Sequence, residues 1–260
     1  MASRTLLIAM LLTFVGEQAE AGFSKAHKEY SKRLPFASGG ELSVKTDDGE
    51  VHILGWEKEE IFIEAELSAH AFSHRKAEKK VEQIRVRVRE SSDFVRISHN
   101  GPSNTEVQYK IHVPHSTSIT CRTDDGTIRI DELVGKIRVE SEDGDIYVND
   151  LKGDLRIRTD DGKIFFSGIL DDVDVITEDG DISGEYRPEG GSYFKTDDGD
   201  IRLKIAIRDS EAPAVFIEND DGEIYSDFPL WIRGNGRNRS ETDLKIKIHT
   251  NDGDIHLVKD

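Results

Sequence analysis

Short runs of alternating apolar and polar residues fill most of the chain, and each run stops at a similar turn. Ile137 and Val139 precede one such turn, and Ile146 and Val148 follow it. An alternation with a period of two is typical of a β-strand that buries one face. The pattern therefore predicts an all-β protein in which each strand has an inward and an outward side.

The turns share a six-residue motif: Thr, Ser or Asn; Asp, Glu or Asn; Asp; Gly; any residue; then Ile or Val. From Gly126 to Gly199 the glycines are 18, 18, 18 and 19 residues apart. An antiparallel meander or barrel needs no equal spacing, whereas a solenoid does, because each coil stacks in register on its neighbour. The spacing favours a β-solenoid with coils of about 18 residues. The eight motif glycines are Gly49, Gly126, Gly144, Gly162, Gly180, Gly199, Gly222 and Gly253.

The chemistry of the motif is that of a tight turn. Asp tolerates turn geometry and accepts hydrogen bonds from nearby backbone N–H groups, and we expect Gly to supply a positive φ. The motif Thr shares the inward phase of the strand, so we expect its hydroxyl to find a partner at the corner. Second corners are expected at Leu133-Val134-Gly135 and at Leu151-Lys152-Gly153.

Several segments depart from the regular repeat. The 77 residues between Gly49 and Gly126 span about four periods, and their strand-like stretches predict further coils with an eroded motif, for about 12 coils in all. Residues 69–82 predict a short exposed helix inserted between strands. Residues 229–243, which contain Gly234-Asn235-Gly236, predict a surface loop.

The amino terminus has the features of a secretory signal peptide. Arg4 is followed by an apolar run from Leu6 to Val15 and by the small-x-small triplet Ala19-Glu20-Ala21. The run is too short to cross a bilayer, which takes about 20 apolar residues. We expect a signal peptide at 1–21, a lead-in or cap at 22–40 and a repeat domain at 41–260. The product is expected to be exported to the periplasm or beyond, with no membrane segment after cleavage.

Composition narrows the classes of partner. The chain carries 52 acidic against 35 basic side chains, a formal charge of −17, which argues against nucleic acid because such binding needs Lys and Arg on phosphate. A single cysteine cannot form an internal disulfide. Cys121 occupies an inward position, so we expect a buried apolar thiol rather than a nucleophile.

Three blocks together resemble a known family. They are Leu42-x-Val44-x-Thr46-x-x-Gly49-x-Val51-x-Ile53-x-Gly55-Trp56, the strand Tyr109-x-Ile111-x-Val113-Pro114 and the serial Thr-x-x-Gly-x-Ile coils. From Phe36 to Asp260 the chain resembles the bacterial putative-adhesin family of exported β-strand repeat proteins, a domain of unknown function. The resemblance implies a right-handed single-stranded β-helix and offers no catalytic residues to carry over. The sequence departs from the family in preferring Asp-Asp-Gly at its turns.

Stacked carboxylates are the first candidate chemistry. In stacked coils the motif acids lie one above another, and Ca²⁺ takes about six to eight oxygen ligands from carboxylates and carbonyls. The alternative is that Asp is a turn residue, since exposed like charges ~4.8 Å apart repel by only ~0.9 kcal/mol. We treat the row as weak calcium candidates in a module without a required cofactor: Asp143, Asp145, Asp161, Asp179, Asp181, Asp198 and Asp200.

A row of outward residues three positions after the Gly is the candidate recognition surface. Tyr147 and Phe165 belong to consecutive coils, and Arg129 and Arg202 share their position. Such a row can bind a sugar or a partner protein, or it can simply stabilise the sheet. His70 and His74, four residues apart, lack the Glu of a zinc protease helix, and we expect an exposed polar segment there.

Taken together, these features predict a non-enzymatic exported repeat protein, an adhesin or a scaffold that binds an envelope protein or glycan. Two alternatives remain open. One is a calcium-dependent module of the same fold. The other is a polysaccharide-active β-helix enzyme, which is disfavoured because an active site is a single constellation whereas these carboxylates recur at every coil.

Overall fold

The computed structural model describes residues 24–207, 213–232 and 245–260, which are mostly β-strand with one short helix. The twenty strands of these residues join in a single mixed sheet. The expected signal peptide at 1–21 lies outside the described residues, as does most of the loop expected at 229–243, including Gly234-Asn235-Gly236. The start of that loop was predicted wrongly, because Leu230–Ile232 is a strand.

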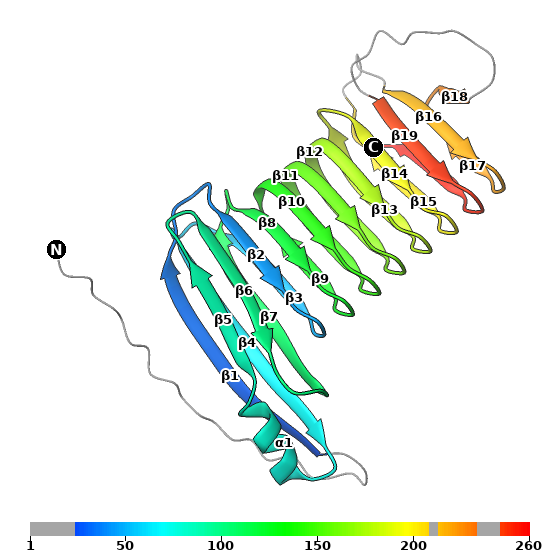
Figure 1. Cartoon of the computed structure of the whole chain (residues 1–260). Coiled ribbons are helices and arrows are strands. Elements are labelled where there is room, and N and C mark those ends of the chain that lie inside the picture. Colours follow the sequence, from blue (N-terminus) through cyan, green and yellow to red (C-terminus); the bar gives the residue numbers. More distant parts are fainter. Residues whose placement is uncertain (1–23, 208–212, 233–244) are drawn as a thin grey trace.

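Two faces of stacked strands make up most of the molecule (Figure 1). One face, here called the groove face because a groove crosses it, consists of the strands that lead into the motif turns. In spatial order they are β2 (Glu41–Lys45), β8 (Ser118–Arg122), β10 (Val134–Glu140), the later parts of β11 (Ile146–Arg158) and β12 (Ile164–Ile176), β14 (Ser192–Lys195), β19 (Lys245–Thr250) and β16 (Ala214–Asn219).

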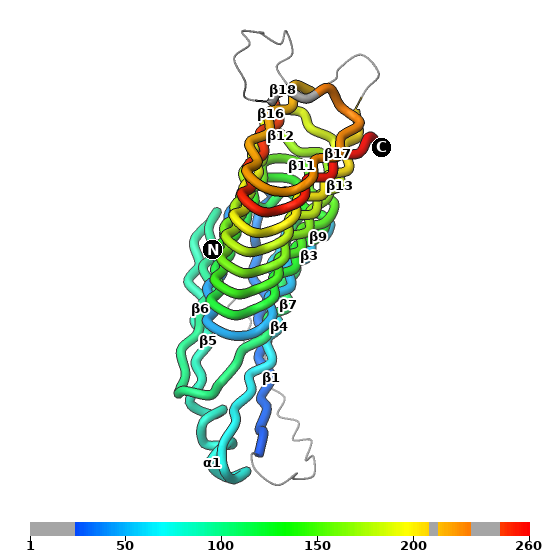
Figure 2. Tube along the Cα trace, turned by 90° about the vertical axis from the view of Figure 1, so that its right-hand side faces the viewer, coloured from blue at the N-terminus to red at the C-terminus, as the bar shows by residue number. Residues whose placement is uncertain are grey.

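The other face, here called the aromatic face because it carries the row with Tyr147 and Phe165, consists of the strands that follow the motif turns. In spatial order they are β3 (Val51–Trp56), β9 (Ile128–Asp131), the first parts of β11 and β12, β13 (Ile182–Pro188), β15 (Ile201–Ile205), β20 (Ile255–Lys259) and β17 (Ile224–Ser226). Viewed along the stack, the coils form nested U-shaped arcs that join the two faces at the turns (Figure 2).

All of these neighbouring strands run parallel, and equivalent positions of successive coils face each other. Ile137 of β10 pairs with Ile119 of β8 on one side and with Leu155 of β11 on the other, each 18 residues away. The stacking in register that the spacing predicts is therefore present from β8 through β15. Each inward side chain rests on the same position of the next coil, which is why the apolar alternation repeats so faithfully.

The chain does not visit the coils in spatial order. The coil of β2 and β3 lies between β6 (Phe94–Asn100) with β7 (Thr105–Pro114) and β8 with β9. The last coil, β19 and β20, lies between β14 with β15 and the outermost coil of β16 and β17. Strand β18 (Leu230–Ile232) pairs parallel with β16 at that end.

The prediction of four further coils between Gly49 and Gly126 is wrong. Only β6 and β7 stack in parallel there, on β2 and β3. Antiparallel pairs join β1 (Ser24–Pro35) to β4 (Glu60–Ala71), β4 to β7, and β5 (Arg85–Glu90) to β6. The error has a physical cause: a strand with one buried face shows the same period of two whether its neighbour runs parallel or antiparallel.

The inserted helix is present but shorter than predicted. α1 (His74–Val81) packs against β1 and β4, as Figure 1 shows, and buries Ala77 and Val81. His70 belongs to β4, so it shares no helix with His74, which pairs with Glu78 at 3.3 Å. No helix among the described residues is long and apolar enough to span a membrane.

The core is a thin column of inward side chains running the length of the stack. The alternating apolar residues expected to face inward, such as Val139 and Ile157, are buried, and Cys121 is fully buried among them. Burial raises the pKa of the Cys121 thiol to about 12, so it stays protonated and inert, as predicted. Near the middle of the stack, Phe166 stacks on Phe194 with ring centroids 5.7 Å apart.

Candidate functional site

The buried hydroxyl of the motif forms a ladder between coils. Thr177 Oγ1 donates to the carbonyl of Asp160 in the coil before it (2.9 Å) and accepts from the N–H of Gly180 in its own turn (3.1 Å). Thr196 repeats the arrangement, donating to Glu178 and accepting from Gly199, at 3.1 Å each. The prediction that Thr finds a partner at the corner is confirmed, and the bond to the preceding coil also ties adjacent coils together.

Removing this hydroxyl is expected to destabilise the stack. Thr177→Val keeps the shape but leaves the buried N–H of Gly180 without its acceptor, at a cost of about 1–3 kcal/mol in the free energy of unfolding. Thr177→Ser keeps the acceptor, as the natural Ser141 does for Gly144 at 3.2 Å. Urea unfolding of both variants measures the difference. Equal stability of the Val and Ser variants would show that the hydroxyl ladder does not hold the coils.

The motif glycines are required for a reason other than the predicted one. A Cβ on Gly162 would lie 2.1 Å from the carbonyl oxygen of Gly144, and one on Gly144 would lie 2.2 Å from that of Gly126. These glycines do not have φ in the left-handed region, so the prediction of a positive φ is wrong for the inner coils. Positive φ occurs at the two ends of the glycine stack, at Gly49 (113°) and Gly222 (126°).

Left-handed backbone is concentrated at the second corner instead. Gly135 (φ 151°) and Gly153 (φ 134°) lie where second corners were predicted, and Glu132 and Asp150 just before them have φ of 58° and 52°. The chain thus reverses at this corner through positive φ, whereas the motif turn depends on close backbone approach.

The carboxylates after the motif Gly serve as hydrogen-bond acceptors between coils. Asp145 Oδ1 accepts from the N–H of Lys163 (3.0 Å), and Asp181 Oδ1 accepts from the N–H of Asp200 (3.0 Å). Asp200 in turn accepts from the N–H of Asp254 (2.8 Å). That backbone hydrogen bond, with help from Arg202, lowers the pKa of Asp200.

The carboxylates before the motif Gly point to solvent. Asp143, Asp161, Asp179 and Asp198 are exposed, and their side chains have no hydrogen-bond partner among the described residues. Across the described ranges no three His, Cys, Asp or Glu residues are grouped closely enough to hold a metal ion. At the start of the ladder, partial burial and the neighbouring charges of Asp125 and other acids raise the pKa of Asp48.

The structure brings the predicted recognition residues into one straight row on the aromatic face. Cα partners run from strand to strand through Arg129, Tyr147 and Phe165, and further along through Arg202. The full row is His52, Arg129, Tyr147, Phe165, Ser183, Arg202, His256 and Tyr225.

The two arginines of this row already have partners within the protein. The Arg129 guanidinium lies 4.5 Å from the centroid of the Tyr147 ring and 3.0 Å from a carboxylate oxygen of Glu50. Arg202 is paired with Asp200. These contacts fit the structural role weighed for the row, and the recognition role stays a prediction.

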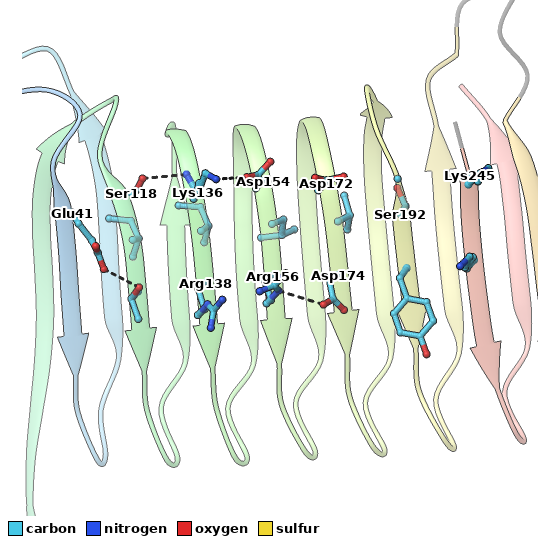
Figure 3. Close-up of a pocket in the computed structure, with 18 residues that line it drawn as sticks. Glu41, Ser118, Lys136, Arg138, Asp154, Arg156, Asp172, Asp174, Ser192 and Lys245 are labelled. Atoms are coloured by element: carbon cyan, nitrogen blue, oxygen red, sulfur yellow. Dashed lines mark hydrogen bonds and ion pairs between the residues drawn. The ribbon is translucent and has the colours of Figure 1, made fainter. Parts of the chain in front are cut away.

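The groove face carries a feature that the sequence pattern did not reveal. A groove of about 800 Å³ crosses seven strands, from β2 through β8, β10, β11, β12 and β14 to β19 (Figure 3). One outward row of the groove is Thr120, Arg138, Arg156, Asp174, Tyr193 and Lys247, which are Cα partners on successive strands. The repeated motif does not predict these residues, because they lie outside the turn and vary from coil to coil.

Comparisons with known proteins found one family model and several similar solved structures. The family model described as Toastrack DUF4097 matches residues 33–258. Similar solved structures include a putative cell adhesion protein from Clostridium sporogenes, at 12% identity over 90% of this chain and 100% of that one, with a TM-score of 0.40. A putative adhesin from Bacteroides fragilis shares 10% identity over 89% of this chain and 97% of that one, with a TM-score of 0.41.

A putative adhesin from Parabacteroides distasonis shares 13% identity over 89% of this chain and 97% of that one, with a TM-score of 0.38. No curated protein matches the chain. Structural similarity this low carries no argument about function, so the assignment rests on the family model, which covers most of the sequence. The chain belongs to the Toastrack DUF4097 family.

Proposed function

We propose that the protein is an exported, non-enzymatic rod that binds an envelope glycan or protein, as an adhesin or scaffold of the cell envelope. Its parallel coils form a right-handed β-solenoid, with the signal peptide at 1–21 removed on export. Nucleic acid is no partner, because a chain of charge −17 repels phosphate.

One observation carries this proposal: outward side chains form straight rows along the stack, and one of the two faces is hollowed into a groove. Rows that repeat at the inter-strand spacing of about 4.8 Å suit an extended partner lying along the rod. The motif carboxylates recur coil after coil and several accept backbone N–H groups, which is a structural role.

The test is to bind the purified full chain to isolated bacterial envelopes and to assay the same envelopes for new reducing ends. We expect saturable binding without chemical change in the polysaccharide. Release of products, abolished by Asp→Asn changes in one coil, would establish the enzymatic alternative and end the proposal.

We further propose that the rod needs no calcium. A specific site stabilises the folded state in proportion to its occupancy, so it would give a saturable rise in melting temperature as calcium is titrated. We expect only the weak effect of charge screening, equal for Ca²⁺ and Mg²⁺. A large rise that saturates at micromolar Ca²⁺ and is absent with Mg²⁺ would favour the calcium-dependent module instead.

A further inference from the structure

The groove face carries more basic than acidic side chains, whereas the whole chain carries more acidic than basic ones. Five cationic side chains and four carboxylates line the groove itself. The adjoining outward row adds four more cations, Lys45, Arg122, Arg158 and Lys195, and one carboxylate, Glu140. With Glu218 of β16, which continues this row, the two sets hold nine cations against six carboxylates, in a chain with 35 against 52. Acids are concentrated at the turns, and this face has a small excess of bases.

Within the groove, two neighbouring guanidinium groups are available to a ligand. Arg138 is exposed and forms no ion pair or hydrogen bond among the described residues. Arg156, its Cα partner on β11, lies 3.3 Å from a carboxylate oxygen of Asp174. That carboxylate is already held by both terminal nitrogens of Arg158, at 3.0 and 2.8 Å. Arg156 is thus the second cation on one anion, and its charge is only partly compensated.

The groove also offers a ring and hydroxyl groups beside these cations. Tyr193 of β14 is half-buried and lies between Asp174 and Lys247 in the outward row. Ser118 and Thr120 line the other end, where Thr120 donates to Glu41 at 3.4 Å. Guanidinium groups bind carboxylates in a bidentate manner, and a Tyr ring presents both an apolar face and a polar tip.

The shape selects an extended ligand. Seven stacked strands at the usual inter-strand spacing make the groove about 29 Å long. The groove lies on the face of the sheet, where backbone N–H and C=O groups are already paired between strands. A peptide cannot add as a strand there, because strand addition needs a free edge. Recognition must run through side chains, which suits a glycan better than a peptide.

We infer that the groove is a binding site for a linear acidic polysaccharide, with Arg138 and Arg156 holding its carboxylate groups and Tyr193 packing against a sugar ring. This inference rests on the proposed function and names the ligand class of one face of the rod. The polymer lies along the stack, across β8 to β19, and keeps away from the acidic turns.

The test uses the full chain and polygalacturonate, a linear polymer of uronic acid, in isothermal titration calorimetry at low and at physiological salt. We expect binding that weakens as salt rises, since exposed charges are screened. The groove variant Arg138→Gln/Arg156→Gln is expected to bind about tenfold more weakly, which corresponds to about 1.4 kcal/mol. Tyr193→Ala is expected to weaken binding without changing the salt dependence, because its contribution is uncharged.

The matched control is Arg87→Gln/Arg89→Gln, which removes the same two charges from exposed side chains of β5, outside both faces of the stack. It is expected to change the affinity by less than about twofold, because long-range charge effects are screened. Equal losses in the two double variants, or equal binding of a neutral linear glucan or of polyglutamate, overturn the inference. Melting temperatures of all variants exclude unfolding as the cause.

The outcomes separate the inference from the function on which it rests. Saturable envelope binding without polygalacturonate binding overturns the acidic-polysaccharide site and leaves the binding rod standing. If the protein binds neither envelopes nor polygalacturonate, both the acidic-polysaccharide site and the binding rod are contradicted.

Discussion

Gly162→Ala is expected to lower the melting temperature by about 6–12 °C, because a Cβ in this position would lie 2.1 Å from the carbonyl oxygen of Gly144. That oxygen belongs to a backbone held by coils on both sides, so it cannot move away without disturbing the stack. Overpacking typically costs about 1–3 kcal/mol, and we expect the upper end, about 3 kcal/mol, because the clash is with backbone. Thermal unfolding followed by circular dichroism measures the loss.

The control is Gly191→Ala. Gly191 lies between coil strands like the motif glycines, but the nearest atom to its Cβ is a side-chain oxygen of Asp172 at 3.9 Å, and its φ is not left-handed. We expect a change of about 0.5 kcal/mol or less there. If both substitutions lowered the melting temperature alike, the loss would reflect chain entropy or general sensitivity rather than close backbone approach in the motif ladder.

Phe166→Ala is expected to cost about 3–5 kcal/mol, the usual loss for a buried Phe that leaves a cavity. Phe166 is fully buried, stacks on Phe194 and lies 5.5 Å from the ring of Tyr186. Gly184 on the neighbouring coil makes room for it, since a Cβ there would lie 2.2 Å from the Phe166 ring. The narrow core has no second layer that could collapse into the gap.

Its neighbour Phe165 provides a control with the same chemistry. Phe165 follows the opposite phase of β12 and lies half-buried on the aromatic face. We expect Phe165→Ala to cost about 1 kcal/mol or less. Equal losses at the two positions in urea unfolding would contradict the assignment of inward and outward sides.

The features that follow from local chemistry could be predicted from the sequence. The inward apolar set, the burial of Cys121 and the inward Thr all depend on the period of two, which each strand records by itself. The stacking of coils between β8 and β15 could be predicted from the equal spacing of the motif, because coils that stack in register have nearly equal lengths.

Features that depend on partners distant in sequence could not be predicted. The direction of β4 relative to β7 and the insertion of β19 between β14 and β16 leave no trace in apolar alternation. The glycine requirement was misassigned because close approach to another coil and a positive φ both select Gly. The groove could not be predicted because its residues lie on seven different strands and come together only when the coils stack.

The high acidity of the chain is mostly a property of its turns. Most of the motif acids serve the turns, either by accepting backbone N–H groups, as Asp145 does, or by projecting into water, as Asp161 does. The charge of −17 therefore arises largely from building corners, and recognition is assigned to the faces between them.

The most direct test compares envelope binding by the wild-type chain and by Asp143→Asn/Asp161→Asn, with calcium and with a chelator. These two carboxylates are exposed and have no hydrogen-bond partner in the described part of the chain, so the change removes charge from the turns without touching either face. The account predicts saturable binding of equal affinity in all four conditions. Binding that requires calcium and is lost in the variant would contradict it, because the turns rather than the faces would then carry the function.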